Sequence, residues 1–267
     1  MSTPDQTPVA TIPGLEAFAS AQPADEPRTK RRGPSTEELL DGLNEPQKAA
    51  VQHQGAPLLV VAGAGSGKTR VLTRRIAWLI SQRGAHPGSI LAITFTNKAA
   101  AEMKERVEVL VGKRARIMWV STFHSACVRI LRKEIDKVGL KSNFSIYDAQ
   151  DQKRLMQLVL SDLDLDPRHY QPGQVLNWVS DQKNELRDVE AAEKDARNHL
   201  EQTYVAAYKE YQKRLRQANA LDFDDLIMST VELFRTYPEV REVYRRRFRH
   251  VLVDEYQDTN HAQYALV

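Results

Sequence analysis

The stretch LLVVAGAGSGKT, residues 58–69, decides the fold. Its first four residues are apolar and predict a buried strand, and the glycine-rich remainder predicts a tight loop. The amphipathic residues 70–80 follow at once and predict a helix. A strand, a glycine loop and a helix in this order are typical of a site for phosphate groups, because a helix N-terminus presents free N–H groups to an anion.

The glycine-rich part is interpreted as a phosphate-binding loop. Its three glycines allow backbone conformations that a Cβ disfavours, so main-chain N–H groups can turn inward around a phosphate. Lys68 is predicted to reach the terminal phosphates, and the Thr69 hydroxyl is predicted to bind Mg²⁺. Ala62 stands where the strict pattern G-x-x-x-x-G-K-[ST] begins with glycine. The predicted nucleotide-contacting residues here are Ala62, Gly63, Ala64, Gly65, Ser66, Gly67, Lys68, Thr69 and Arg70.

The composition is that of a globular protein. With 267 residues and 42% hydrophobic content, the chain can form one large domain or two modest ones. No stretch approaches the roughly twenty consecutive apolar residues of a membrane helix, and the N-terminus lacks the apolar core of a signal peptide. We therefore expect a soluble, cytoplasmic protein with no membrane partner. The single cysteine, Cys127, excludes an intrachain disulfide and a cysteine-rich metal site. A net charge of +3 with a pI of 8.9 is only a weak indication of nucleic-acid binding.

The N-terminal residues 1–38 are predicted to be a disordered, proline-rich tail. Six of the twelve prolines lie within residues 1–34, together with a short basic run at 30–32 that we interpret as solvated. Ordered structure is expected to begin near Ser35 or Thr36, because Ser35 with Glu38, or Thr36 with nearby acidic residues, suits a helix N-cap.

The rest of the chain predicts an α/β fold with helices on both faces of a parallel sheet. Strands are expected at 58–62, 90–95, 117–121 and 250–253, with helices at 70–80, 98–111 and 123–138. The β signal fades between 139 and 220, where helices are expected at 149–160, 172–186 and 191–218.

An insertion interrupts the predicted sheet. Lys68 and Asp254 are 186 residues apart, whereas one strand, helix, strand unit takes roughly thirty. We therefore predict a core domain of residues 39–138 and 221–267, interrupted by an all-helical subdomain of residues 139–220.

The segment VLVDEYQD, residues 251–258, provides the second half of the predicted nucleotide site. Ligands of open α/β sheets bind at the carboxyl ends of the strands, where Asp254 and Glu255 follow a buried-looking strand. Asp254 is placed to hold Mg²⁺ opposite Thr69. Glu255 can orient or deprotonate a water that attacks the γ-phosphate, which implies hydrolysis.

The base of the nucleotide is partly predictable. The segment that begins N-K at Asn97 has Ala100 where the guanine-reading pattern N-K-x-D needs an aspartate, so the guanine reading fails. Gln47 offers both a donor and an acceptor, which the edge of adenine requires. Chemistry alone would more often make Gln47 a surface residue.

Five segments together resemble the UvrD/PcrA-type superfamily 1 DNA helicases. They are LNEPQKAAV from Leu43, AGAGSGKTRVL from Ala62, ITFTNKAAAEM from Ile93, STFHSACVRIL from Ser121 and VDEYQDTN from Val253. LDFDDLI from Leu221 also fits that family, and the resemblance runs from about residue 43 to 267.

The resemblance implies a RecA-like domain 1A interrupted by a helical domain 1B. It makes Gln47 the residue that reads adenine, and it makes Asp254 and Glu255 the metal and catalytic carboxylates beside Lys68. Gln257 is implied to couple the nucleotide state to the grip on DNA.

The resemblance also implies DNA contacts at the carboxyl ends of the strands expected at 90–95 and 117–121. Hydroxyls and helix N-termini at these ends can bind backbone phosphates, and Phe95 can stack on an unpaired base. Without the resemblance, Phe95 reads as a core residue. His124 is nearly as well interpreted as a structural histidine, and the basic residues 241–249 are interpreted as a solvated helix face in preference to a DNA contact. The predicted DNA-binding residues are Thr94, Phe95, Thr96, Asn97, Lys98, Thr122, Phe123 and His124.

The function implied by the resemblance is that of a DNA helicase in repair or replication. Such a protein uses ATP and Mg²⁺, and single-stranded DNA stimulates its ATPase activity. It translocates 3′ to 5′ and acts at junctions of single- and double-stranded DNA. Its partners include repair proteins that the sequence does not identify. Resembling proteins continue past the position of Val267 with a further sheet motif and a second RecA-like domain. We expect the 267-residue chain alone to bind nucleotide, and DNA weakly, without unwinding duplex or hydrolysing ATP at a useful rate. A non-catalytic nucleotide- or DNA-binding module and the helicase half of a RecB-type nuclease remain as alternatives.

Overall fold

The computed structural model describes residues 33–267. The predicted tail and its basic run 30–32 lie almost wholly outside the described residues. Helix α1, Thr36–Leu40, begins within the last part of the predicted tail. Ser35 is its N-cap and forms a reciprocal capping box with Glu38, as the sequence predicts.

A three-stranded parallel sheet, in the order β2-β1-β5, forms the centre of the fold. The strands are β1, Ile90–Thr94, β2, Trp119–Thr122, and β5, His250–Val253. All five residues of β1 are buried, as expected for a central strand with covered faces. The α/β fold and the strands expected at 90–95, 117–121 and 250–253 are therefore confirmed.

Helices cover both faces of this sheet. Successive side chains of β1 alternate between two buried clusters, because neighbouring Cβ atoms of a strand point to opposite faces. Ile90 and Ala92 pack with helices α2, α3 and α4, whereas Leu91 and Ile93 pack with α5, α10 and α11. These helices are α2, Glu45–Gln52, α3, Lys68–Ser81, α4, Asn97–Val111, α5, Phe123–Glu134, α10, Phe223–Thr236, and α11, Pro238–Arg247.

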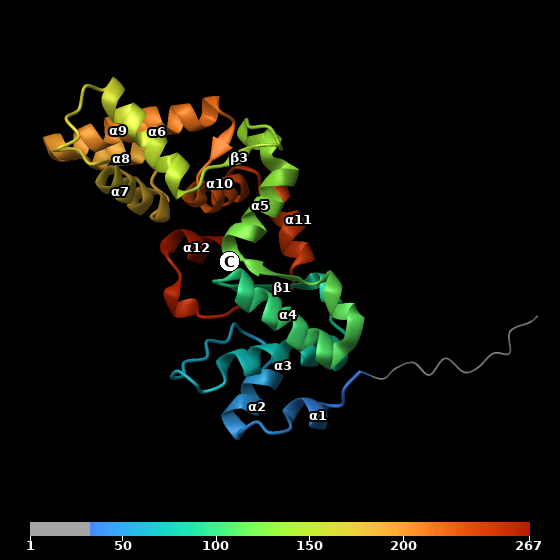
Figure 1. Cartoon of the computed structure of the whole chain (residues 1–267). Helices are drawn as coiled ribbons and strands as arrows, with labels where there is room; N and C mark the ends of the chain where they lie inside the picture. Colours follow the sequence, from blue (N-terminus) through green and yellow to red (C-terminus); the bar gives the residue numbers. More distant parts are fainter. Residues whose placement is uncertain (1–32) are drawn as a thin grey trace, which may run out of the picture. The chain divides into compact units, whose positions relative to one another are not determined.

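A group of helices between α5 and α10 has its own buried cluster (Figure 1). Its members are α6, Ala149–Asp162, α7, Pro172–Asn184, α8, Val189–Asp195, and α9, His199–Gln217. The helix predicted over 191–218 is wrong in one respect, because it is two helices. Asn198 caps α9 by accepting from the N–H of Glu201, and such an N-cap begins a new helix.

A two-stranded parallel sheet joins the segment before α6 to the segment after α9. Its strands are β3, Ser145–Ile146, and β4, Ala220–Leu221. Ser145 N donates to Asn219 O at 3.0 Å, and Tyr147 N donates to Leu221 O at 2.9 Å. Strands of two residues carry no sequence periodicity, so the sequence predicts neither of them. The remaining elements are α12, His261–Leu266, and the 3₁₀ helices η2, Pro87–Ser89, η3, Gly112–Ile117, η4, Ile135–Val138, and η5, Tyr256–Asp258.

The strand predicted at 58–62 is wrong. This segment is irregular, pairs with no strand among residues 33–267, and exposes Leu59 by 67% and Val61 by 87%. An apolar run indicates a tendency to be buried, but a strand also needs a neighbouring edge that supplies backbone hydrogen bonds. Figure 1 shows the segment between α2 and α3 as a loop.

None of the helices that the structure describes combines the length and the apolar character needed to cross a membrane.

A buried ionic cluster joins the helical group to α10. Lys183 of α7 lies 2.7 Å from a carboxylate oxygen of Asp222 and 2.8 Å from one of Asp225. The Tyr211 hydroxyl donates to Asp222 at 3.1 Å, and Gln212 Nε2 donates to Asp225 at 3.0 Å. Burial, followed by the charge of Asp222, raises the pKa of Asp225 to about 6, against the opposing effect of Lys183. One cation thus holds two carboxylates that also cap α10.

We predict that Lys183→Met lowers the free energy of unfolding by about 3–5 kcal/mol at pH 7, because it leaves two carboxylates buried without their cation. A carboxyl whose folded pKa lies above its unfolded value stabilises the fold at low pH and loses that contribution as pH rises through the folded pKa. Removal of the Lys183 charge raises the folded pKa of both carboxyls, so the variant gains more stability on their protonation than the wild type does, and the deficit should shrink from pH 7 to pH 5. Urea unfolding at both pH values measures it.

Lys153→Met is the matched control, because Lys153 is an exposed lysine on α6. We expect it to change stability by less than about 0.5 kcal/mol at either pH. Equal effects of the two substitutions would contradict the assigned role of the buried cluster.

Candidate functional site

The phosphate-binding loop is held by its own polar groups. Ser66 donates from both N–H and hydroxyl to Gly63 O, at 3.3 Å and 2.7 Å. Lys68 Nζ donates to Ala62 O at 3.1 Å and to Gly63 O at 3.4 Å. The lysine ammonium therefore lies inside the curve of the loop, where phosphate oxygens of a nucleotide would replace these carbonyls as its partners.

Two glycines of the loop have backbone conformations that favour glycine. Gly65 has φ +73° and Gly67 has φ +85°, and Gly67 is the N-cap of α3. A Cβ on Gly67 would lie 3.2 Å from Gln47 Nε2. Gly63, by contrast, has no positive φ, and a methyl group added to its Cα would meet no neighbour within 4 Å. The conformational requirement predicted for Gly63 is therefore wrong.

The loop meets the acidic strand end through one hydrogen bond. Thr69 Oγ1 donates to Asp254 Oδ2 at 3.3 Å, across 185 positions of the chain. Asp254 follows β5 and donates its N–H to Ile93 O of β1 at 2.9 Å. The two oxygen groups that the sequence predicts as metal ligands are thus adjacent.

The environment of Asp254 raises the pKa of its carboxyl. Burial is the main cause and the charge of Glu255 adds to it, while the hydrogen bond from Thr69 and the charge of Lys68 act in the opposite direction. Glu255 has φ +50°, an uncommon conformation for a residue with a Cβ. Gln257 Nε2 donates to a Glu255 carboxylate oxygen at 2.6 Å, which fixes that side chain beside Asp254.

A hydroxyl and a carboxylate suit Mg²⁺, which prefers oxygen ligands and keeps several waters. No group of three or more His, Cys, Asp or Glu side chains that could hold a metal occurs in residues 33–267.

Gln47 links α2 to the phosphate-binding loop. Its Nε2 donates to Ser66 O at 2.9 Å, and its Oε1 accepts from Asn44 N at 3.0 Å. An amide has two donor hydrogens and two acceptor lone pairs, so one of each remains for a base. The structure therefore places Gln47 at the loop, whereas chemistry alone would make it a surface residue.

The aromatic residues at the strand ends have distinct roles. Phe95 is 37% exposed, and its ring meets the ring of Phe123 edge to face at 5.9 Å. Phe123 is only 2% exposed and belongs to the core. The ring of Phe95 is therefore exposed to a ligand, whereas the buried ring of Phe123 packs against Phe95. The DNA contact predicted for the Phe123 side chain is therefore wrong in this conformation.

The threonines near these ends are mainly structural. Thr96 and Thr122 are the N-caps of α4 and α5 and accept from Ala99 N and Ser125 N. Thr94 is 1% exposed and donates to Thr96 O at 3.0 Å, so the contact predicted for its hydroxyl is wrong in this conformation. Asn97 and Lys98 open α4 on its exposed side. Their helix N-terminus provides backbone N–H groups for an anion.

The half-buried ring of His124 contacts the exposed ring of Phe223. The two rings meet edge to face at 5.6 Å, and Phe223 is 45% exposed. Burial lowers the pKa of His124, against the charge of the neighbouring Asp224. The LDFDDLI segment predicted no role for Phe223, although an aromatic residue among three aspartates is a pattern that could have indicated one.

Comparison with known proteins identifies the family of the chain. The family model of the UvrD/REP helicase N-terminal domain matches residues 43–267. The chain belongs to the UvrD/REP helicase family. It is 60% identical over 243 residues to the ATP-dependent DNA helicase UvrD1 of Mycobacterium tuberculosis, a match that covers 89% of this chain and 32% of that protein.

Another member of the UvrD/REP family is similar over nearly the same range. The ATP-dependent DNA helicase PcrA of Bacillus subtilis is 53% identical over 230 residues, which cover 86% of this chain and 31% of PcrA. The chain thus spans about a third of the length of the curated relatives it matches. All five segments that carry the resemblance lie within the matched residues 43–267.

We predict that Gly67→Ala lowers the free energy of unfolding of this UvrD/REP family domain by about 1–2 kcal/mol, the usual cost of a left-handed conformation for a residue with a Cβ. Gly63→Ala in the same loop is the control, and its effect should stay within about 0.5 kcal/mol because the added methyl meets open space. Urea unfolding followed by circular dichroism compares them. A larger loss for Gly63→Ala would contradict the observed loop geometry.

Proposed function

We propose that this chain is the nucleotide- and DNA-binding part of an ATP-dependent DNA helicase that translocates 3′ to 5′. The hydrogen bond between Thr69 and Asp254 carries the proposal, because it brings a phosphate-binding loop and an acidic strand end into one site. The names of the relatives, which are ATP-dependent DNA helicases, support the substrate class. DNA repair or replication is the proposed setting, and junctions of single- and double-stranded DNA are the proposed substrates.

The proposed domain division follows the buried clusters. Residues 39–138 and 221–267 form the proposed motor domain, and residues 139–220 form the proposed helical insertion. The separate buried cluster of α6, α7, α8 and α9 supports this division. The ionic cluster of Lys183 with Asp222 and Asp225 would transmit the position of the insertion to the first turn of α10.

The proposed nucleotide is ATP with Mg²⁺. Lys68 and the N–H groups of the loop would hold the phosphates, and Thr69 with Asp254 would hold the metal. Mg²⁺ would neutralise charge on the phosphate oxygens when bound. Glu255 would orient a water molecule and accept its proton, and Gln257 holds the Glu255 carboxylate in place for that task. Gln47 would contact the adenine edge with its remaining donor and acceptor.

The proposed DNA track runs over the carboxyl ends of β1 and β2. Phe95 and Phe223 are exposed aromatic rings that unpaired bases can stack on. The N-termini of α4 and α5, with Asn97 and Lys98, would bind backbone phosphates. His124 would position the Phe223 ring through their edge-to-face contact.

The nucleotide site is tested with a fluorescent ATP analogue. We expect Lys68→Ala to weaken binding by about 1.5–3 kcal/mol, roughly 10- to 150-fold in dissociation constant, because it removes charge-assisted hydrogen bonds to phosphate. Chelation of Mg²⁺ should weaken binding by the wild-type chain as well. Lys113→Ala, which removes an exposed lysine of η3, is the control and should bind as the wild type does. Unchanged binding by Lys68→Ala would refute the proposed site.

The DNA track is tested with labelled single-stranded oligo-dT. We expect Phe95→Ala to weaken binding by about 1–3 kcal/mol, roughly 5- to 150-fold, because one stacked base loses its platform. Val109→Ala is the control, since Val109 is 80% exposed on α4 and lies outside the track. Fluorescence anisotropy measures both. Equal affinity of Phe95→Ala and Val109→Ala would exclude stacking on Phe95.

A further inference from the structure

A hollow of about 630 Å³ lies beside β2, one of the two edge strands of the sheet. Residues of β2, of helices α4, α5 and α11 and of the 3₁₀ helix η3 line it, and no residue of β1 does. Four of the ten lining residues are basic and none is acidic. The basic residues are Lys104, Arg116, Arg129 and Arg247.

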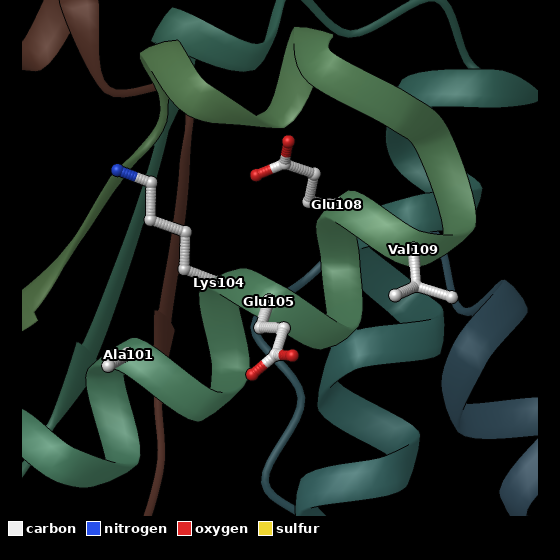
Figure 2. Close-up of a pocket in the computed structure, with 5 residues that line it drawn as sticks. All are labelled: Ala101, Lys104, Glu105, Glu108 and Val109. Carbon is white, nitrogen blue, oxygen red and sulfur yellow. The ribbon is translucent and has the colours of Figure 1, made fainter.

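Three of these four cations have no acidic partner among residues 33–267. Arg116 pairs with Glu108 at 2.7 Å, but Lys104, Arg129 and Arg247 form no ion pair within the part of the chain that the structure describes. Figure 2 shows the Lys104 side chain extending away from α4, apart from Glu105. Uncompensated positive charge around a hollow attracts an anion.

The wall of the hollow also contains unsatisfied buried polar groups. Trp119 is 5% exposed, and its Nε1–H lacks a hydrogen-bond partner among residues 33–267, as does the buried Oγ of Ser121. An indole N–H is a donor only, so its missing partner must be an acceptor. Buried polar groups are rarely left unpaired, and each such group calls for an explanation.

The Trp119 indole ring also contacts two of the cations, Arg129 and Arg247. The guanidinium carbons of Arg129 and Arg247 lie 4.0 Å and 4.6 Å from the centre of the Trp119 ring. Such cation–π contacts hold a guanidinium in place and leave its N–H groups for a ligand. Arg247 differs in this from Arg245 and Arg246, which pair with Glu242 on their own helix.

The hollow is continuous with the proposed DNA track. Ser125 lines the hollow, accepts from Thr122 Oγ1 at 2.9 Å and donates to Asn97 Oδ1 at 3.5 Å. We propose that the hollow binds the phosphodiester backbone of single-stranded DNA where the strand passes the edge of the sheet. The proposal rests on the proposed function and extends the track beyond the first turn of α5.

Oligo-dT of two lengths tests this subsite with the 267-residue chain. A strand of about 6 nucleotides is chosen to cover the track alone, and one of about 16 is chosen to reach the hollow as well. We expect Arg129→Gln and Arg247→Gln each to weaken binding of the longer strand severalfold and to leave binding of the shorter strand unchanged. Each substitution should also reduce the slope of log affinity against log salt by about 0.7 for the longer strand, the value for one phosphate contact of a single strand.

Two further variants complete the test. Arg83→Gln is the matched control, because Arg83 lies 5.9 Å over the ring of Trp78 and does not line the hollow. It should bind both strands as the wild type does. Trp119→Phe removes the indole N–H and keeps an aromatic ring. It should weaken binding of the longer strand and leave binding of the shorter strand unchanged. Arg129 and Arg247 are exposed, so their variants test the subsite even where Trp119→Phe is too unstable to study.

Several results would overturn the inference. If the arginine variants bind the longer strand as the wild type does while Phe95→Ala loses binding, the subsite is refuted and the proposed function stands. If the arginine variants weaken binding of the two strands equally, their charges attract DNA in a general way and no subsite exists. Displacement of the longer strand by polyglutamate at equal charge concentration would identify an acidic protein segment as the better occupant. If the wild-type chain binds neither strand, the proposed function fails as well.

Discussion

Parallel pairing of β1 with β5 is the contact through which distant parts of the chain form one site. Val253 lies opposite Ile93 in the register, and the next residue, Asp254, donates its N–H to Ile93 O at 2.9 Å. That hydrogen bond fixes Asp254 within reach of Thr69, which lies in the first turn of α3 behind the phosphate-binding loop. Closing so long a segment costs chain entropy, which grows slowly with its length. The burial of β1 on both faces offsets this cost, because apolar side chains leave water on each side.

The helical group between the two strands is anchored at two places. Strands β3 and β4 tie its first and last residues together, and Lys183 binds Asp222 and Asp225 at the start of α10. These carboxylates also form the capping box of α10, so the same groups set where that helix begins. Phe223 lies between them in the chain and faces solvent beside His124. A movement of the helical group would therefore reach an exposed aromatic residue of the proposed DNA track.

Sequence patterns predicted the elements whose signals are local. Strands β1 and β5 are runs of apolar residues, and the capping box at Ser35 lies within four residues. The strand predicted at 58–62 failed, because the pattern describes side chains and not the neighbouring edge that a strand requires. The contacts predicted for Thr94 and Phe123 failed for a related reason. Their residue types suit DNA, but packing buries both side chains.

By itself, the sequence determined the chemistry of the phosphate-binding loop, since Gly65, Gly67 and Lys68 act through backbone angles and short-range hydrogen bonds encoded within a few residues. Tertiary structure alone decided which aromatic rings are exposed and which cations remain unpaired. It brought Arg129 and Arg247 to Trp119 from separate helices. Exposure and charge compensation depend on segments far apart in the chain, and a linear pattern does not record which of these segments pack together.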